Sequence, residues 1–169
     1  MVLHRYDLET PLGSVGVLQS DTGICRLLLG SEDAEQHLRK WRIRFAPDEN
    51  CVDGDPDGLL QHALSAYFAG QKATPTVPLD LRGSEFQMRV WQELLRIPYG
   101  TVVPYKLVAQ GIGSPGASQA VGAANGANPI PILVPCHRVV STRGLGGFSA
   151  PMEWKLGLLR LEGVCLELA

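Results

Sequence analysis

A thiol next to an imidazole is the feature of this chain with the clearest chemical potential. Cys136 and His137 are adjacent, and the segment 128–135 before them contains three prolines among mainly apolar residues. The reactive species is the thiolate, so a neighbouring base that removes its proton in an enclosed pocket turns an ordinary cysteine into a nucleophile. We therefore predict that Cys136 carries the chemistry of this protein.

The composition is that of a globular protein with room for one large core or two small ones. The 169 residues are 45 % hydrophobic and 19 % charged, which does not favour disorder. The sequence has neither a secretory signal pattern nor an apolar run long enough to cross a membrane. We expect a cytoplasmic protein without a membrane partner.

The cysteines do not form a recognisable framework. The four of them, Cys25, Cys51, Cys136 and Cys165, lie far apart without a Cys-x-x-Cys pair, which argues against structural disulfides and a zinc ribbon. Three histidines accompany two of these cysteines in the first half, but the spacings match no compact ligand pattern. We predict no metal site.

Charge is distributed unevenly between the two halves. Residues 1–83 contain 8 Lys and Arg against 12 Asp and Glu, and residues 84–169 contain 7 against 5, so the halves carry about −4 and +2. A mildly positive second half is compatible with a polyanionic partner but lacks the strong basic footprint of an avid non-specific binder. Charge alone does not predict DNA binding.

The first half reads as short strands followed by two helices. Turn signals and alternating apolar residues predict a hairpin or small antiparallel sheet within residues 8–30. Helical spacing predicts a helix from Ser31 to about Arg44 and another over 57–69, separated by an acidic loop at 46–56. The proline-rich segment 74–83 predicts an extended linker, with a domain boundary near Gly83.

The second half contains the pattern of a helix-turn-helix. Ser84 and Gln87 form a capping-box pattern before a helix with one apolar face. Further helices are expected over 104–110 and 115–124, joined by a glycine turn at 111–114. Helix, tight turn and helix in this order are typical of a helix-turn-helix.

The last of these helices is composed almost entirely of small residues. Only Gln119, Val121 and Asn125 have side chains longer than a methyl or hydroxyl group in 116–125. Such a helix can read few base edges, but it can approach a sugar-phosphate backbone closely without selecting a sequence. Tight packing against neighbouring helices is the alternative interpretation.

The combination of this unit with the downstream Pro-Cys-His-Arg-Val motif resembles the O6-alkylguanine-DNA alkyltransferases, also called methylated-DNA–protein-cysteine methyltransferases. The resemblance covers about half of the chain. It rests on matches in order, namely Phe86-Gln87, Val90-Trp91, 97–100, Tyr105, Gly113, Pro115, 120–122, Asn125, Asn128-Pro129, 135–139 and 161–163.

The resemblance implies an α+β fold in two domains. Residues 1–83 would form a variable, RNase H-like domain with a small N-terminal antiparallel sheet, helices and the linker. Residues 84–169 would form a mostly helical winged-helix or helix-turn-helix domain that binds DNA and accepts the alkyl group. The family acts on double-stranded DNA containing O6-alkylguanine, and also on O4-alkylthymine. The resemblance further implies a monomeric, single-turnover enzyme without a cofactor.

Catalytic roles follow residue by residue from the same resemblance. Cys136 would accept the alkyl group from a flipped base, His137 would take the thiol proton through a water, and Glu162 would orient His137. A water is expected because neighbouring side chains in extended backbone point to opposite sides. Asn128 would brace the site, and Tyr105 would contact the flipped nucleotide and help to protonate the leaving base.

DNA and substrate contacts are implied in the same way. The predicted DNA-binding residues are Ala117, Ser118, Gln119, Ala120, Gly122, Asn125 and Arg138. The pocket loop 139–150 would read the guanine edge with main-chain groups, with Ser149 near O6. The predicted substrate-pocket residues are Trp91, Pro131, Val139, Gly147, Phe148 and Ser149.

Three positions depart from the family pattern. Gln119 stands where the family usually has an arginine that fills the gap left by the flipped base, so we expect weaker repair of duplex DNA. Phe148 replaces a frequent tyrosine, and Pro104 replaces a frequent serine or threonine. Both changes remove a hydroxyl group. We expect this loss to alter substrate preference and not to abolish function.

Three other functions remain open from the sequence. A lesion sensor similar to alkyltransferase-like proteins would bind alkylated DNA without transfer, but those proteins lack the cysteine. A Cys-His hydrolase would use Glu162 to complete a triad, although no oxyanion loop is evident. A purely DNA-binding regulator would need longer side chains on its recognition helix than this chain provides.

Overall fold

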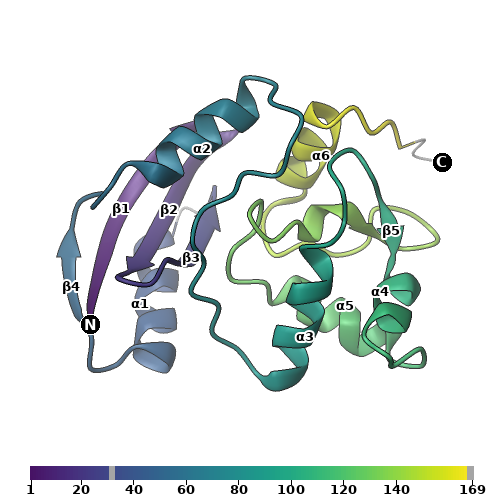
Figure 1. The fold of residues 1–169 in the computed structure, drawn as a ribbon, viewed down its shortest axis with the longest axis horizontal. Coiled ribbons are helices and arrows are strands. Elements are labelled where there is room, and N and C mark those ends of the chain that lie inside the picture. The colour runs from purple at the N-terminus through teal and green to yellow at the C-terminus, as the bar shows by residue number, and fades with distance from the viewer. Residues whose placement is uncertain (31–32, 167–169) are drawn as a thin grey trace.

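The computed structural model describes residues 1–30 and 33–166. The first half forms a four-stranded sheet from β1 (Val2–Thr10), β2 (Gly13–Ser20), β3 (Ile24–Leu29) and β4 (Asn50–Asp53) (Figure 1). The strand order is β3-β2-β1-β4, with antiparallel pairing of β1 with β2 and β2 with β3. An α+β fold with a small N-terminal sheet is confirmed.

Two details of the predicted sheet were wrong. The first strand begins at Val2 and not near residue 8 as predicted. Its early part was missed because the polar residues His4 and Arg5 interrupt the apolar alternation that predicts strands. The segment 46–56, predicted as a loop, contains β4, which pairs in parallel with β1 and makes the sheet mixed. β4 is an edge strand with mostly exposed residues, so it lacks the alternation that burial of one face imposes.

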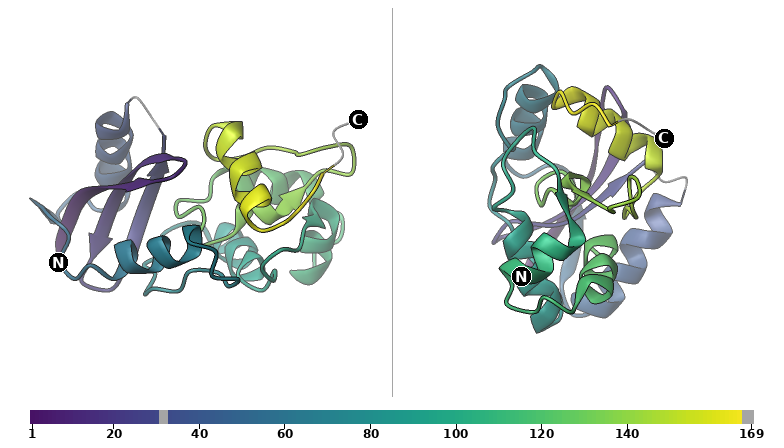
Figure 2. Two further views of the ribbon diagram at one scale, coloured as in Figure 1. Left: turned by 90° about the horizontal axis from the view of Figure 1, so that it is seen from above. Right: turned by 90° about the vertical axis from the view of Figure 1, so that its right-hand side faces the viewer.

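Two helices pack on opposite faces of this sheet (Figure 2). α1 (Ala34–Phe45) covers one face through Leu38 and Trp41, and α2 (Leu59–Phe68) covers the other through Leu60, Leu64 and Tyr67. Both helices were predicted near these positions. The predicted helix start at Ser31 lies outside the described residues.

The proline-rich segment after α2 packs along the edge of the sheet and is not a free linker between the two halves. The main-chain N–H of Ile24 donates to the carbonyl of Pro78 at 2.9 Å, and the N–H of Asp80 donates to the carbonyl of Ile24 at 2.8 Å. Val77 and Leu79 pack against the core. The segment is extended, as predicted, and its main chain is paired in part with the edge strand β3.

The second half contains four α-helices and short connecting elements. α3 (Glu85–Leu94) is followed by β5 (Val103–Pro104), α4 (Tyr105–Gly111) and α5 (Ser118–Gly126), then by a 3-10 turn η1 (Cys136–Arg138), β6 (Val139–Val140) and α6 (Met152–Leu161). α4 and α5 form the predicted helix-turn-helix pair. α5 begins three residues later than predicted because Pro115 and Gly116 belong to a turn, in which the N–H of Ala117 donates to the carbonyl of Ser114.

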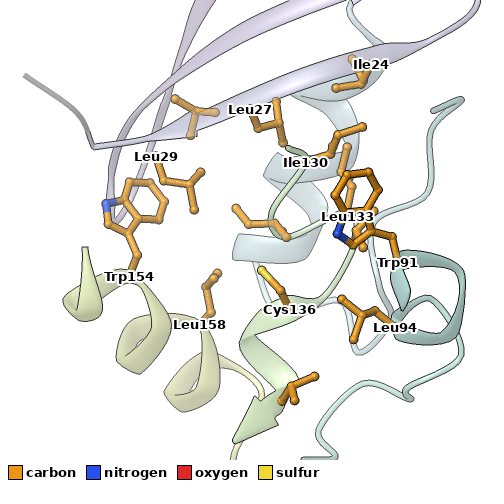
Figure 3. Close-up of a cluster of buried hydrophobic side chains, with 14 of the residues drawn as sticks. Ile24, Leu27, Leu29, Trp91, Leu94, Ile130, Leu133, Cys136, Trp154 and Leu158 are labelled. Atoms are coloured by element: carbon orange, nitrogen blue, oxygen red, sulfur yellow. The ribbon is translucent and has the colours of Figure 1, made fainter. Parts of the chain in front are cut away.

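One hydrophobic core joins the two halves (Figure 3). Leu27 and Leu29 of β3 belong to the same cluster as Trp91, Leu133 and Cys136 from the second half. The N–H of Leu27 also donates to the carbonyl of Pro129 at 2.9 Å. The candidate nucleophile therefore lies in a core to which both halves contribute. No helix among the described residues is both long and apolar enough to cross a membrane.

The start of α3 provides a first test of this fold. The Ser84 hydroxyl accepts from the N–H of Gln87 at 3.2 Å, and the Gln87 side chain accepts from the N–H of Ser84 at 3.0 Å. We expect Ser84→Ala to lower the free energy of unfolding by about 1 kcal/mol, measured by urea denaturation. Ser84→Asp retains a cap acceptor and is the control; equal loss in both variants would contradict this role.

Candidate active site

The loop before the motif is shaped by the side chain of Asn128. Its Nδ2 donates to the carbonyl of Val134 at 2.8 Å, and its Oδ1 accepts from the N–H of Ile130 at 3.0 Å. Within this loop Ile132 has a φ of 73°, a conformation that β-branched residues rarely adopt and that costs on the order of 1–3 kcal/mol. Asn128 therefore holds a strained loop that delivers Cys136 to the core.

Cys136 and His137 lie in a 3-10 turn and not in extended backbone. This corrects the local geometry expected from the sequence, and η1 begins directly after Pro135. The side chain of Cys136 has no exposed surface. Its sulfur lies 3.9 Å from the hydroxyl oxygen of Ser149. The candidate nucleophile is accordingly enclosed, with Ser149 of the pocket loop against it.

Burial sets the protonation of the thiol. Removal from water raises the pKa of Cys136, while hydrogen bonds from Asn128 and Ser149 and the positive charge of Lys155 oppose this rise. The thiol therefore does not ionise readily by itself in this structure. Formation of a thiolate requires a nearby base and compensating positive charge.

His137 keeps one ring nitrogen able to accept a proton. Its Nε2 lies 2.9 Å from Glu162 Oε1, and since an ionised carboxylate only accepts, Nε2 carries the proton and Nδ1 carries the lone pair. Nδ1 is buried and has no hydrogen-bond partner within residues 1–30 and 33–166. Burial lowers the pKa of His137 against the opposing effect of Glu162, so the ring is neutral at pH 7 and can accept a proton.

Arg138 belongs to this site and not to a DNA-binding surface. Its guanidinium is fully buried, and it donates to Glu162 through Nη2 at 2.8 Å and through Nε at 3.0 Å. Its Nη1 donates to the carbonyl of Ile97 and to the hydroxyl of Thr74, each at 2.8 Å. The prediction that Arg138 contacts DNA was wrong, because sequence position does not reveal that a charged residue is paired inside the core.

Glu162 is the point where these groups converge. Burial by itself raises its pKa, but hydrogen bonds from His137 and Arg138 and their charges hold the pKa well below its usual range. The N–H of Gly100 also donates to Oε2 at 3.2 Å, and the hydroxyl of Tyr67 donates to Oε1 at 2.8 Å. Tyr67 was missed from the sequence because it lies in the other half, where its helical spacing marks it only as a core residue.

Tyr105 and Lys155 hold the pocket loop. The hydroxyl of Tyr105 accepts from the N–H of Gly147 at 3.0 Å. The ammonium of Lys155 donates to the carbonyls of Val139 and Gly147 at 2.8 Å and 2.9 Å. Burial lowers the pKa of Lys155 to about 8, partly offset by the proximity of Cys136. Lys155 was not among the predicted site residues, because a lone lysine in the sequence of an amphipathic helix reads as exposed.

Other predicted pocket residues lie around this loop. Val139 is buried and pairs with Val103, and Pro131 is buried beside the motif. The half-buried ring of Phe148 lies 5.9 Å from the Lys155 ammonium. Trp91 of α3 is buried, and its indole N–H donates to the carbonyl of Ala124 on α5 at 2.8 Å. These contacts give Trp91 a packing role, and a part in the substrate pocket stays a prediction.

The predicted DNA-binding residues of α5 divide into exposed and buried ones. Gln119 and Ala120 are exposed, and Ala117, Ser118 and Gly122 are partly exposed. Asn125 has no exposed surface, and its Nδ2 lies 3.4 Å from the carbonyl of Cys136. A DNA contact of Asn125 is therefore wrong for this structure, since the residue faces the motif.

Among the residues that the structure describes, no group of three or more His, Cys, Asp and Glu side chains could hold a metal ion. Cys25, Cys51, Cys136 and Cys165 are free thiols.

Comparisons with known proteins cover both halves of the chain. The DNA-binding domain of 6-O-methylguanine DNA methyltransferase matches residues 85–164, and its ribonuclease-like domain matches residues 3–81. The methylated-DNA–protein-cysteine methyltransferase of Mycolicibacterium paratuberculosis is 54 % identical over 92 % of this chain and 89 % of its own length. That of Methanosarcina acetivorans is 50 % identical over 93 % and 96 %.

A solved structure has the same fold. The Mycobacterium tuberculosis OGT in complex with DNA superposes with a TM-score of 0.78 at 38 % identity, covering 94 % of this chain and 92 % of that one. The chain belongs to the family of methylated-DNA–protein-cysteine methyltransferases, also called O6-alkylguanine-DNA alkyltransferases.

The Glu162–Arg138 pair gives this site a pH-dependent contribution to stability. Glu162→Gln leaves the Arg138 charge buried and unpaired, so we expect a loss of about 3–5 kcal/mol at pH 7. The native carboxyl pKa lies below its ordinary value of 4.5, so the contribution is fully present above about pH 5 and is lost as pH falls through the native pKa. Urea unfolding at pH 7 and pH 3 measures this difference.

The matched control is Glu93→Gln. Glu93 pairs with Arg96 at 3.5 Å, and the side chain of Arg96 is 78 % exposed, so we expect a loss below about 0.5 kcal/mol. Similar losses in the two variants at pH 7, or a Glu162→Gln effect that does not shrink at pH 3, would contradict the assignment.

Proposed function

We propose that this protein repairs DNA by direct reversal of base alkylation. It transfers an alkyl group from O6 of guanine in duplex DNA, and from O4 of alkylthymine where present, to Cys136. The transfer is irreversible, and each molecule acts once. The observation that carries this proposal is the buried Cys136 beside a neutral His137 that keeps one ring nitrogen free, in a chain that belongs to this family.

The residues of the site provide for each step of the transfer. His137 takes the proton from the Cys136 thiol, through a bridging water as the family resemblance implies, and Glu162 holds the imidazolium that forms. The thiolate attacks the alkyl carbon, so that an S–C bond forms while the C–O6 bond breaks and its electron pair stays with the guanine. A proton then neutralises the leaving base, with Tyr105 beside the pocket loop as its donor. No cofactor takes part.

Electrostatic support for the thiolate comes from Lys155. Its ammonium is buried and bonded to the two carbonyls of the pocket loop, and Lys155 and Cys136 influence each other's pKa. A positive charge near a developing thiolate favours the ionised form. Lys155 therefore offsets part of the cost of forming a charge in a buried site.

The substrate base has to leave the duplex to reach this site. Cys136 has no exposed surface, and enzymes that react with a base generally extrude it into a pocket. α5 supports the docking of DNA, because Gln119 and Ala120 are exposed and small residues allow close approach to the backbone without reading sequence. One chain contains all the proposed groups, so we propose that the protein acts as a monomer.

Intact-mass spectrometry tests the proposed function. The protein is incubated with a duplex oligonucleotide containing O6-methylguanine, beside Cys136→Ala and an unmodified duplex. We expect a gain of one methyl group per molecule, absent in the variant and with the unmodified duplex. No gain in the intact protein, with selective binding to the lesion retained, would replace this proposal by a lesion sensor.

The side chain at position 119 determines how strongly the protein binds the DNA around the extruded base. A neutral side chain provides a weaker hydrogen bond to phosphate or base than a charged one, by roughly 1 kcal/mol or more. We expect Gln119→Arg to raise the rate of repair of duplex DNA by about fivefold or more, with little change for a free modified base. Single-turnover rates with both substrates measure the effect.

The control for added charge is Gln71→Arg. Gln71 is exposed in the first half, so this variant has the same net charge without a change on α5. Equal acceleration by the two substitutions would show a general charge effect, and an unchanged rate in Gln119→Arg would contradict the role of this position.

A further inference from the structure

The carboxylate of the site is bonded to a side chain from the other half of the protein. Tyr67 lies on α2, and its hydroxyl donates to Glu162 Oε1 at 2.8 Å across 95 residues of sequence. Tyr67 is 1 % exposed and Glu162 is 6 % exposed. A hydrogen bond to a buried carboxylate is among the stronger ones in proteins, so this contact is more than incidental packing.

A second contact reaches the same network from the segment after α2. The hydroxyl of Thr74 lies 2.8 Å from Nη1 of Arg138, whose remaining nitrogens hold Glu162. Tyr67 and Thr74 therefore act on the two members of one buried ion pair. Neither contact involves the helix-turn-helix or the pocket loop.

We propose that Tyr67 and Thr74 are positioning residues for the His137–Glu162 pair, so that the sheet-containing half takes a direct part in alkyl transfer. This inference rests on the proposed function for its catalytic consequence. Its structural content, the control of His137 by contacts from the other half, does not depend on that function.

The crowding at Glu162 Oε1 explains how Tyr67 acts. This one oxygen accepts from His137 Nε2, from Arg138 and from Tyr67. The Tyr67 bond withdraws charge from the oxygen and fixes its orientation toward the imidazole. Without it, more negative charge faces His137, which raises the pKa of the imidazole, and the ring is held less firmly.

Other charged and titratable groups also face this pair. They are Arg138 on the same turn, Lys155 of α6, and Tyr99, whose hydroxyl donates to the carbonyl of Leu161 and whose pKa is raised by burial and by Glu162. Of these groups, Arg138 and Tyr99 also interact with Tyr67 electrostatically, but the Tyr67 hydroxyl makes its hydrogen bond with Glu162. The direction of the effect is therefore set by the lost hydrogen bond.

Tyr67→Phe and Tyr6→Phe form a matched pair of variants. Both tyrosines are buried in the same half, and the hydroxyl of Tyr6 donates to Gln19, away from the site. Each substitution removes one buried hydroxyl and retains the ring. A merely structural role of Tyr67 predicts the same behaviour in the two variants.

Two measurements separate the possibilities. The first is the NMR titration of the His137 imidazole nitrogens, which needs no substrate. The second is the single-turnover rate of methyl transfer from an O6-methylguanine duplex as a function of pH. We expect Tyr67→Phe to move the His137 midpoint and the acid limb of the rate profile to higher pH, with a rate roughly threefold to tenfold lower on that limb.

Tyr6→Phe is expected to change melting temperature only. If Tyr67→Phe matches Tyr6→Phe in both measurements, the proposal is overturned. If the wild-type protein transfers no methyl group, the proposed function fails, and the imidazole titration still decides the role of Tyr67. If Tyr67→Phe does not fold, Thr74→Val provides the same comparison through Arg138, and an unchanged His137 titration in that variant overturns the proposal.

Discussion

The buried carboxylate of Glu162 is the constraint on which the rest of this structure depends. A charge removed from water is costly by several kcal/mol unless it is paired and its lone pairs are satisfied. Here Arg138 supplies the opposite charge, its neighbour His137 donates a hydrogen bond, and Gly100 and Tyr67 donate two more from elsewhere in the chain. Four segments, which carry Glu162, residues 137–138, Gly100 and Tyr67, must therefore dock correctly before the charge is stable. The same docking orients the imidazole of His137, the residue after the candidate nucleophile, so stability and the proposed reactivity depend on one network.

Burial opposes the reaction in one respect and favours it in another. It raises the pKa of Cys136, which disfavours the thiolate, and it lowers the pKa of His137, which keeps the base neutral and able to accept a proton. The cationic Lys155 supplies part of the missing compensation. An enclosed site also limits the access of bulk water, which would otherwise compete with the thiolate for the substrate. This arrangement suits a protein that reacts once, because the thiol of Cys136 does not have to be regenerated after the transfer.

The strained loop at Ile132 and the shared core explain why the two halves form one structural unit. Asn128 closes the loop, and the carbonyl of Pro129 accepts from Leu27 of the sheet. Strain of this kind persists only where surrounding contacts over-determine the backbone. The sheet is thus part of the support for the motif, and the contacts of Tyr67 on α2 with Glu162 and of Thr74 with Arg138 extend that support into the site.

The helix-turn-helix, the capping box at Ser84 and the family could be predicted from the sequence alone, which also singled out Cys136 as the candidate nucleophile. These features follow from local spacing or from a contiguous motif, for which short-range physics suffices. The edge strand β4, the 3-10 turn at Cys136 and the burial of Arg138 and Asn125 were decided only by the tertiary structure. An edge strand carries no burial pattern, and a charged residue shows its partner only when distant segments meet. Tyr67 is the clearest case, because nothing in a helical repeat of apolar residues indicates a carboxylate 95 positions away; the three-dimensional packing of the two halves creates that contact.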